Sequence, residues 1–102
     1  MIFNLFQRNN PLKEIIAQGN FHIIDVREAS EFAGSRLSGA INMPLSRFNE
    51  FIPDIQKMNG PIILHCQSGM RSGQATKRLK AKGITEVYNG GGIGKMRRLL
   101  SL

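Results

Sequence analysis

A short apolar run that leads directly into a polar loop and a helix most constrains how this chain folds. Residues 61–64 (PIIL) are apolar, which is typical of a strand buried on both faces of a parallel sheet. Residues 72–82 contain no proline, carry apolar positions one turn apart and stop at Gly83, as a helix does. The segment 65–71 is therefore predicted to join a strand to a helix. Loops of this kind, at the carboxyl ends of parallel strands, are where ligands bind.

The remainder of the chain alternates between strand-like and helix-like patterns. Strands are expected at 21–27, 39–44 and 84–88, and helices at 11–18, 28–33, 46–55 and 95–102. Ser46 is a candidate cap for the third of these helices, and Pro53 predicts an irregularity or break within it. Asn89 and the glycines at 90–92 are expected to form a turn. The alternation predicts an α/β fold with a small parallel sheet of four to five strands flanked by helices. We expect an N-terminal extension at 1–10, which leaves a fifth strand open, and one domain at 11–102.

Composition narrows the classes of function. A chain of 102 residues with 41% apolar and 21% charged residues is typical of one globular domain. It has no apolar stretch long enough for a transmembrane segment. A single cysteine cannot form an intramolecular disulfide and favours a cytoplasmic location. The formal charge of +7 favours an anionic ligand, and no recognised motif indicates nucleic-acid binding.

Cys66, the single cysteine, stands where the apolar run ends. A thiolate there faces a helix N-terminus and the guanidinium of Arg71, and both favour the charged form and lower the thiol pKa. His65 is an unsuitable base because adjacent side chains in a strand point to opposite faces. Cys66 is therefore predicted to be a nucleophile activated by the loop, with an inert core thiol as the alternative.

Asp25 and Arg27 end the first expected strand and project to the same side of it. One interpretation is a partly buried ion pair that fixes the strand end or ties it to a neighbouring loop. The other is direct contact with a substrate.

Several segments, taken in order, resemble the rhodanese family. They are DVR at 25–27, EF at 31–32, GAINMP at 39–44, CQSGMRS at 66–72 and NGG at 89–91. Four residues separate Cys66 from Arg71, whereas cysteine phosphatases have five, and the shorter loop suits a single bound sulfur atom better than a phosphate. The chain departs from the family where SRLSG at 35–39 replaces a usual Gly-His-Ile-Pro-Gly and where Met96 replaces a usual tryptophan.

The resemblance implies a sulfurtransferase. Cys66 would take a sulfane sulfur from a small anionic donor such as thiosulfate and pass it, through a persulfide, to a thiol, cyanide or a protein. Arg71 would orient the donor and close the loop through an acidic residue such as Glu28, while Asp25 and Arg27 would support the site. The expected substrate-binding residues are Gln67, Ser68, Gly69, Met70, Arg71 and Ser72.

No metal or organic cofactor is implied by this resemblance. Two alternatives remain open. One is a sulfur-carrier or binding module with little turnover. The other is a cysteine phosphatase or arsenate reductase.

Overall fold

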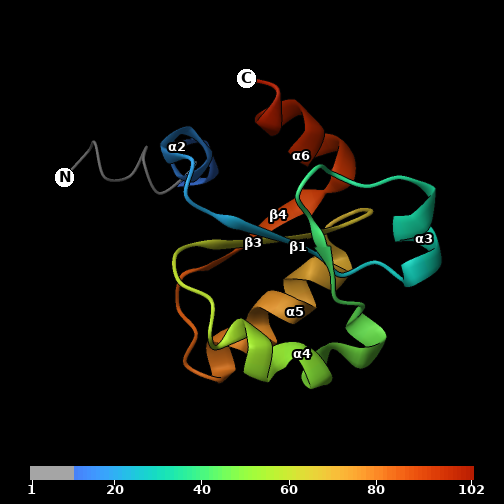
Figure 1. The fold of residues 1–102 in the computed structure, drawn as a ribbon, viewed down its shortest axis with the longest axis vertical. Coiled ribbons are helices and arrows are strands. Elements are labelled where there is room, and N and C mark those ends of the chain that lie inside the picture. The colour runs from blue at the N-terminus through green and yellow to red at the C-terminus, as the bar shows by residue number, and fades with distance from the viewer. Residues whose placement is uncertain (1–10) are drawn as a thin grey trace.

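A four-stranded parallel sheet forms the centre of the computed structural model, which describes residues 11–102 (Figure 1). The strands are β1 (His22–Asp25), β2 (Ile41–Asn42), β3 (Ile62–Cys66) and β4 (Val87–Gly92), in the order β2-β1-β3-β4. Every pair is parallel, which confirms the predicted α/β sheet. The fifth strand left open at 1–10 lies outside the described residues.

Helices cover both faces of the sheet (Figure 1). On one face lie α2 (Pro11–Gln18) and α6 (Ile93–Leu100), and on the other lie α4 (Phe48–Ile55) and α5 (Met70–Ala81). The short helix α3 (Ala29–Gly34) stands at the end of the sheet, and a 3-10 turn, η1 (Leu45–Arg47), leads into α4. No helix in residues 11–102 combines the length and apolar character needed to cross a membrane.

Strand alternation divides the core into two clusters. Ile24, Leu64 and Cys66 face α4 and α5, whereas Ile23 and Ile63 face α2 and α6. Successive side chains of a strand point to opposite faces, so His65 lies on the face opposite Cys66. The Cys66 thiol and the His65 imidazole at the end of β3 therefore lie on opposite sides of the sheet.

The turn predicted for the glycine-rich segment is wrong. Residues 89–92 do not form a turn but continue β4 alongside β3, with a register shift between Leu64 and His65. A Cβ on Gly90 would lie 2.6 Å from Met96 Sδ and 2.8 Å from Ile63 Cγ2. The glycines are needed here because two elements pack closely against the strand.

The helix after β2 differs from its prediction in two ways. Ser46 lies within η1 and Arg47 takes the N-cap position of α4. Pro53 lies inside α4, which continues to Ile55, so the proline does not break the helix. Burial of the apolar side chains Phe48, Ile52 and Ile55 offsets the backbone hydrogen bond that a proline in a helix removes.

Candidate active site

Cys66 is the last residue of β3, and α5 begins four residues later at Met70. Gly69 connects them with φ = 103°, a left-handed conformation that favours glycine. This turn directs the Gly69 N–H at the sulfur, so that it donates to Cys66 Sγ at 3.0 Å. The Ser72 hydroxyl lies 3.5 Å from the same sulfur. The loop therefore surrounds the thiol with hydrogen-bond donors.

The Cys66 side chain is fully buried, and its surroundings change its acidity in two opposing ways. Burial is the largest single influence and raises the pKa of the thiol. Hydrogen bonds from the Ser72 hydroxyl and from the N–H groups of Ser72, Gly69 and Ser68 together outweigh burial, and the pKa is lowered. The loop thus favours a thiolate, the nucleophilic form of cysteine.

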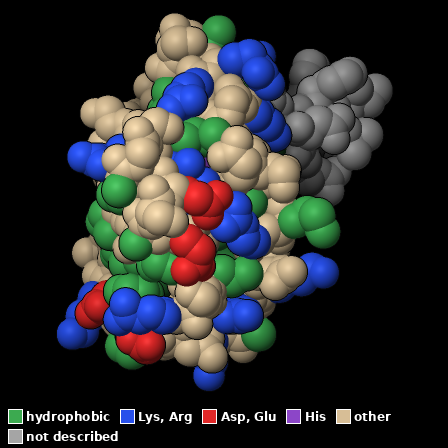
Figure 2. Space-filling model, turned by 90° about the vertical axis from the view of Figure 1, so that its right-hand side faces the viewer, with side chains coloured by type: hydrophobic (Ala, Val, Ile, Leu, Met, Phe, Trp, Pro, Cys, Tyr) green, Lys and Arg blue, Asp and Glu red, His purple; other side chains and the backbone are tan. Residues whose placement is uncertain are grey.

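Arg71 reaches across to α3 and forms a two-pronged ion pair with Glu31. Arg71 Nη1 lies 2.7 Å from Glu31 Oε1 and Nη2 lies 3.0 Å from Oε2. The hydrogen bonds from Arg71, followed by that from the Glu28 N–H, lower the pKa of Glu31 to about 2. On the face of the molecule that carries α3, acidic side chains gather beside Lys and Arg side chains (Figure 2).

The expected partner of Arg71, Glu28, was the wrong carboxylate. Glu28 precedes α3 and forms a capping box with Glu31. Its carboxylate also accepts hydrogen bonds from the Ser46 hydroxyl at 3.0 and 3.1 Å. Glu31 accepts a hydrogen bond from the Glu28 N–H at 2.9 Å and is also the carboxylate that pairs with Arg71.

Asp25, Arg27 and His65 form a buried cluster on the face away from Cys66. Arg27 Nη2 lies 2.8 Å from Asp25 Oδ2 and also donates to the Ser35 carbonyl at 2.6 Å. His65 Nε2 lies 3.5 Å from Asp25 Oδ2, and burial lowers the pKa of His65. The geometry supports the interpretation of an ion pair that fixes the strand end and ties it to the loop at Ser35.

The rim of the loop is formed by Gln67, Ser68 and Met70, all of which are exposed. Met70 is 75% exposed, so an apolar side chain stands beside the buried thiol. The sequence-predicted substrate-binding residues therefore lie together around Cys66, from the solvent-facing rim to Ser72 on the first turn of α5. Arg71 is part of this group but is turned toward Glu31.

Asn89 is a site residue that sequence reasoning missed. Its Oδ1 accepts a hydrogen bond from the Ser72 hydroxyl at 2.7 Å, and its Nδ2 donates to the Gly69 carbonyl at 3.1 Å. The single hydrogen of the Ser72 hydroxyl can be donated to Asn89 Oδ1, to the Gly69 carbonyl at 3.2 Å or to Cys66 Sγ, but only to one of them at a time. The Asn-Gly-Gly pattern was the available signal, but we interpreted it as a turn.

Gly92 brings β4 against the loop. A Cβ on Gly92 would lie 2.5 Å from the Gln67 carbonyl oxygen, so only glycine allows this approach.

Across residues 11–102, no group of three or more His, Cys, Asp or Glu side chains is placed to hold a metal ion.

The chain is similar to known proteins in sequence and in fold. Residues 9–94 match the family model of the rhodanese-like domain. Thiosulfate sulfurtransferase PspE of Escherichia coli (strain K12) is 37% identical over 73 residues, which cover 71% of this chain and 70% of that protein. The uncharacterized protein YqhL of Bacillus subtilis (strain 168) is 43% identical over 67 residues, and the match covers 66% of this chain. It covers 52% of YqhL, so the chain spans about half the length of that relative.

A solved structure described as a rhodanese with anions from E. coli superposes with a TM-score of 0.68 at 35% identity. The superposition covers 74% of this chain and 91% of that one. The match to the family model over most of the chain, the PspE relationship and the shared fold agree with one another. The chain belongs to the rhodanese-like domain family.

Proposed function

We propose that this protein is a sulfurtransferase that carries a sulfane sulfur on Cys66. The family and the thiosulfate sulfurtransferase relative support sulfurtransferase activity in general. The observation that carries the proposal for this residue is the loop geometry. Cys66 Sγ accepts a hydrogen bond from the Gly69 N–H at 3.0 Å, and the pKa of the thiol is lowered although its side chain is fully buried.

In the first step the Cys66 thiolate attacks the outer sulfur of a donor such as thiosulfate. A new S–S bond forms on Cys66, the S–S bond of thiosulfate breaks, and sulfite leaves with the bonding electron pair. The product is a persulfide on Cys66. Backbone N–H groups of the loop stabilise its negative charge as an oxyanion hole stabilises oxygen.

In the second step a thiolate, cyanide or a protein thiolate attacks the terminal sulfur. The S–S bond to Cys66 breaks, Cys66 leaves as a thiolate, and the acceptor departs as a persulfide or as thiocyanate. The sequence contains one cysteine, so no second cysteine within these 102 residues can act as the acceptor. We assign this chemistry to the domain at 11–102, with 1–10 as an extension, and to the cytoplasm.

The Arg71–Glu31 pair bears on the choice of donor. Arg71 is the one cation within the loop segment 66–72. Glu31 accepts one hydrogen bond from each of its terminal nitrogens and offsets its charge. A dianion such as thiosulfate must therefore compete with a carboxylate for this guanidinium. Weak binding of thiosulfate follows, and the physiological donor need not be a dianion.

A sulfur-carrier module with little turnover is the second candidate. Complete burial of Cys66 favours it, because a buried sulfur exchanges slowly with small molecules in solution. A phosphatase is disfavoured by the four-residue separation of Cys66 and Arg71, which leaves less room around the thiolate.

The test is to incubate the protein with thiosulfate, measure its intact mass, then add cyanide and measure thiocyanate. The proposal requires the mass of one added sulfur atom, followed by thiocyanate release. Both signals should be absent in Cys66→Ser and unchanged in Thr85→Ala, a control at an exposed position before β4. Loading without turnover would select the carrier, and no loading together with phosphate release from an aryl phosphate would refute the sulfurtransferase.

A further inference from the structure

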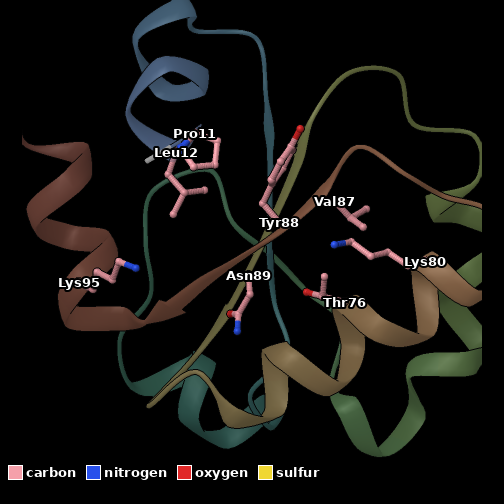
Figure 3. Close-up of a pocket in the computed structure, with 8 residues that line it drawn as sticks. All are labelled: Pro11, Leu12, Thr76, Lys80, Val87, Tyr88, Asn89 and Lys95. Carbon is pink, nitrogen blue, oxygen red and sulfur yellow. The ribbon is translucent and has the colours of Figure 1, made fainter. Parts of the chain in front are cut away.

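A groove runs along the outer edge of β4, away from the Cys66 thiol. Its volume is about 330 Å³, and Figure 3 shows the side chains that surround it. They include Leu12, Thr76, Lys80, Tyr88, Asn89 and Lys95. β4 is an edge strand, since within the described part of the chain only β3 pairs with it. The groove therefore follows an open side of the sheet.

The groove straddles this edge instead of lying on one face. Thr76 and Lys80 come from α5, while Leu12 and Lys95 come from α2 and α6 on the opposite face. Ile62 N–H donates to the Glu86 carbonyl at 2.9 Å. In a parallel ladder the residues that bond to one neighbour alternate, so the backbone groups of Val87 and Asn89 point away from β3, toward the groove. Asn89 is exposed, whereas Val87 is 1% exposed, so an added strand reaches Val87 only after the side chains that cover it move. These groups are the hydrogen-bonding template that an added strand uses.

The charge of the groove restricts what can occupy it. Lys80 and Lys95 extend toward Asn89 from opposite sides (Figure 3), and none of the side chains of residues 11–102 that line the groove is acidic. A second copy of this chain, with a formal charge of +7 and the same two lysines, would be repelled. Residues 1–10 contain no Asp or Glu and so offer no complementary charge.

We propose that the groove binds an extended, acidic segment of a partner protein, which adds to β4 as a fifth strand. Main-chain hydrogen bonds to Val87 and Asn89 would supply affinity, as in other cases of strand addition. Carboxylates on the segment would pair with Lys80 and Lys95 on either side of the strand. A bound segment would thus cover an edge that is otherwise open to unwanted pairing.

The groove leads to the Cys66 loop. Asn89, in the groove, donates to the Gly69 carbonyl and accepts from Ser72. Farther along β4, Gly92 packs against the Gln67 carbonyl. A segment that continues past Asn89 therefore arrives at the rim of the loop. Resting on the proposed function, we assign the segment to the protein that accepts sulfur from Cys66.

The probe is a synthetic, dye-labelled peptide in which pairs of adjacent glutamates alternate with pairs of valines, so that an added strand carries carboxylates on both faces. Binding is measured by fluorescence anisotropy with the full chain. Lys80→Glu/Lys95→Glu should weaken binding by about tenfold or more, because it reverses two charges next to the peptide. Lys57→Glu/Lys82→Glu changes the net charge equally but lies outside the groove, and should leave affinity close to that of the wild type. An equal loss of peptide affinity in both double variants would show that the peptide is held only by the overall positive charge of the chain, and would overturn the proposal.

Backbone NMR tests the strand addition itself. Peptide binding should shift the amide signals of Val87 and Asn89 and slow their hydrogen exchange. Binding without these changes would overturn the added strand. Failure to bind, with both amides already protected in the free chain, would show that the chain covers its own edge and would also overturn the proposal.

Sulfur loading separates this proposal from the function on which it rests. Both double variants should take up sulfur from thiosulfate as the wild type does, because neither changes the loop. A wild-type chain that binds the peptide in the groove but takes up no sulfur would refute the proposed function and the assignment of the acceptor. The acidic-segment site would still be supported by that result.

Discussion

Two Arg–carboxylate pairs stand near the carboxyl end of the sheet, and they differ most in burial. The side chains of Asp25 and Arg27 are 0% and 4% exposed, whereas those of Glu31 and Arg71 are 34% and 33% exposed. Breaking a buried pair strongly destabilises the fold, because the charge that remains has neither a partner nor solvent around it. A pair that water reaches contributes little to stability. The first pair is therefore suited to holding the fold, and the second is free to serve the site.

The position of each pair relative to Cys66 supports this division. Asp25 and Arg27 lie with His65 on the face away from the thiol and bind the chain at Ser35. Arg71 belongs to the same loop as Cys66, and its pKa is raised chiefly by the hydrogen bond to Glu31 and, to a smaller extent, by Cys66. The two pairs contain the same chemical groups but are suited to different roles, because the sheet separates the Asp25–Arg27 pair from the Cys66 thiol.

The largest expected effect on stability comes from breaking the buried pair. Asp25→Ala leaves Arg27 buried without its carboxylate, so we expect the free energy of unfolding to fall by about 3–5 kcal/mol. Urea denaturation measures this change. Glu50→Ala is the control, since it removes a carboxylate from the exposed Arg47–Glu50 pair and should leave the midpoint nearly unchanged. Equal stability of the two variants would show that the buried pair does not hold the fold.

Arg71→Ala should affect the reaction more than the fold. Loss of a half-exposed pair should cost about 0.2–1 kcal/mol of stability, while the thiosulfate concentration needed for half-maximal loading of Cys66 should rise. Intact mass as a function of thiosulfate concentration gives the second quantity, and thermal unfolding gives the first. Arg71→Lys keeps the charge without the two-pronged geometry and should give an intermediate loading curve. A large fall in melting temperature for Arg71→Ala would make this pair structural as well.

The smallest effect concerns the pH dependence of Glu31. Its pKa is lowered from 4.5 to about 2, so its ion pair stabilises the folded state fully above pH 4.5. That contribution is lost as the pH falls toward 2, because the carboxylate becomes protonated. The difference in melting temperature between the wild type and Glu31→Gln should therefore be constant near neutral pH and shrink between pH 4.5 and 2. A difference that is independent of pH over this interval would contradict the assigned ion pair.

Local sequence patterns predicted the parts of the fold that depend on neighbours along the chain. The apolar run before Cys66, the helix that stops at Gly83 and the alternation of elements are confirmed by β3, α5 and the four parallel strands. Cys66 and His65 were correctly placed on opposite faces, since that follows from the two-residue period of a strand. The same period predicted that Asp25 and Arg27 would lie together.

Contacts between distant segments were beyond the reach of these patterns. Glu28 and Glu31 are equally acidic in the sequence, and only the tertiary arrangement places Glu28 beside Ser46 and Glu31 beside Arg71. Asn89 was assigned to a turn, because glycine-rich sequence usually indicates one, although close packing against β4 is what requires the glycines.

The sequence by itself therefore determined the order of the elements, the position of the proposed nucleophile and the face on which it lies, because periodicity and turn chemistry are local properties. Tertiary structure decided that the thiol is buried, that Glu31 engages Arg71, that Asn89 supports the loop and that, within residues 11–102, only β3 pairs with β4. Each of these depends on which distant segments meet, and the packing of helices on both faces of the sheet settles that question.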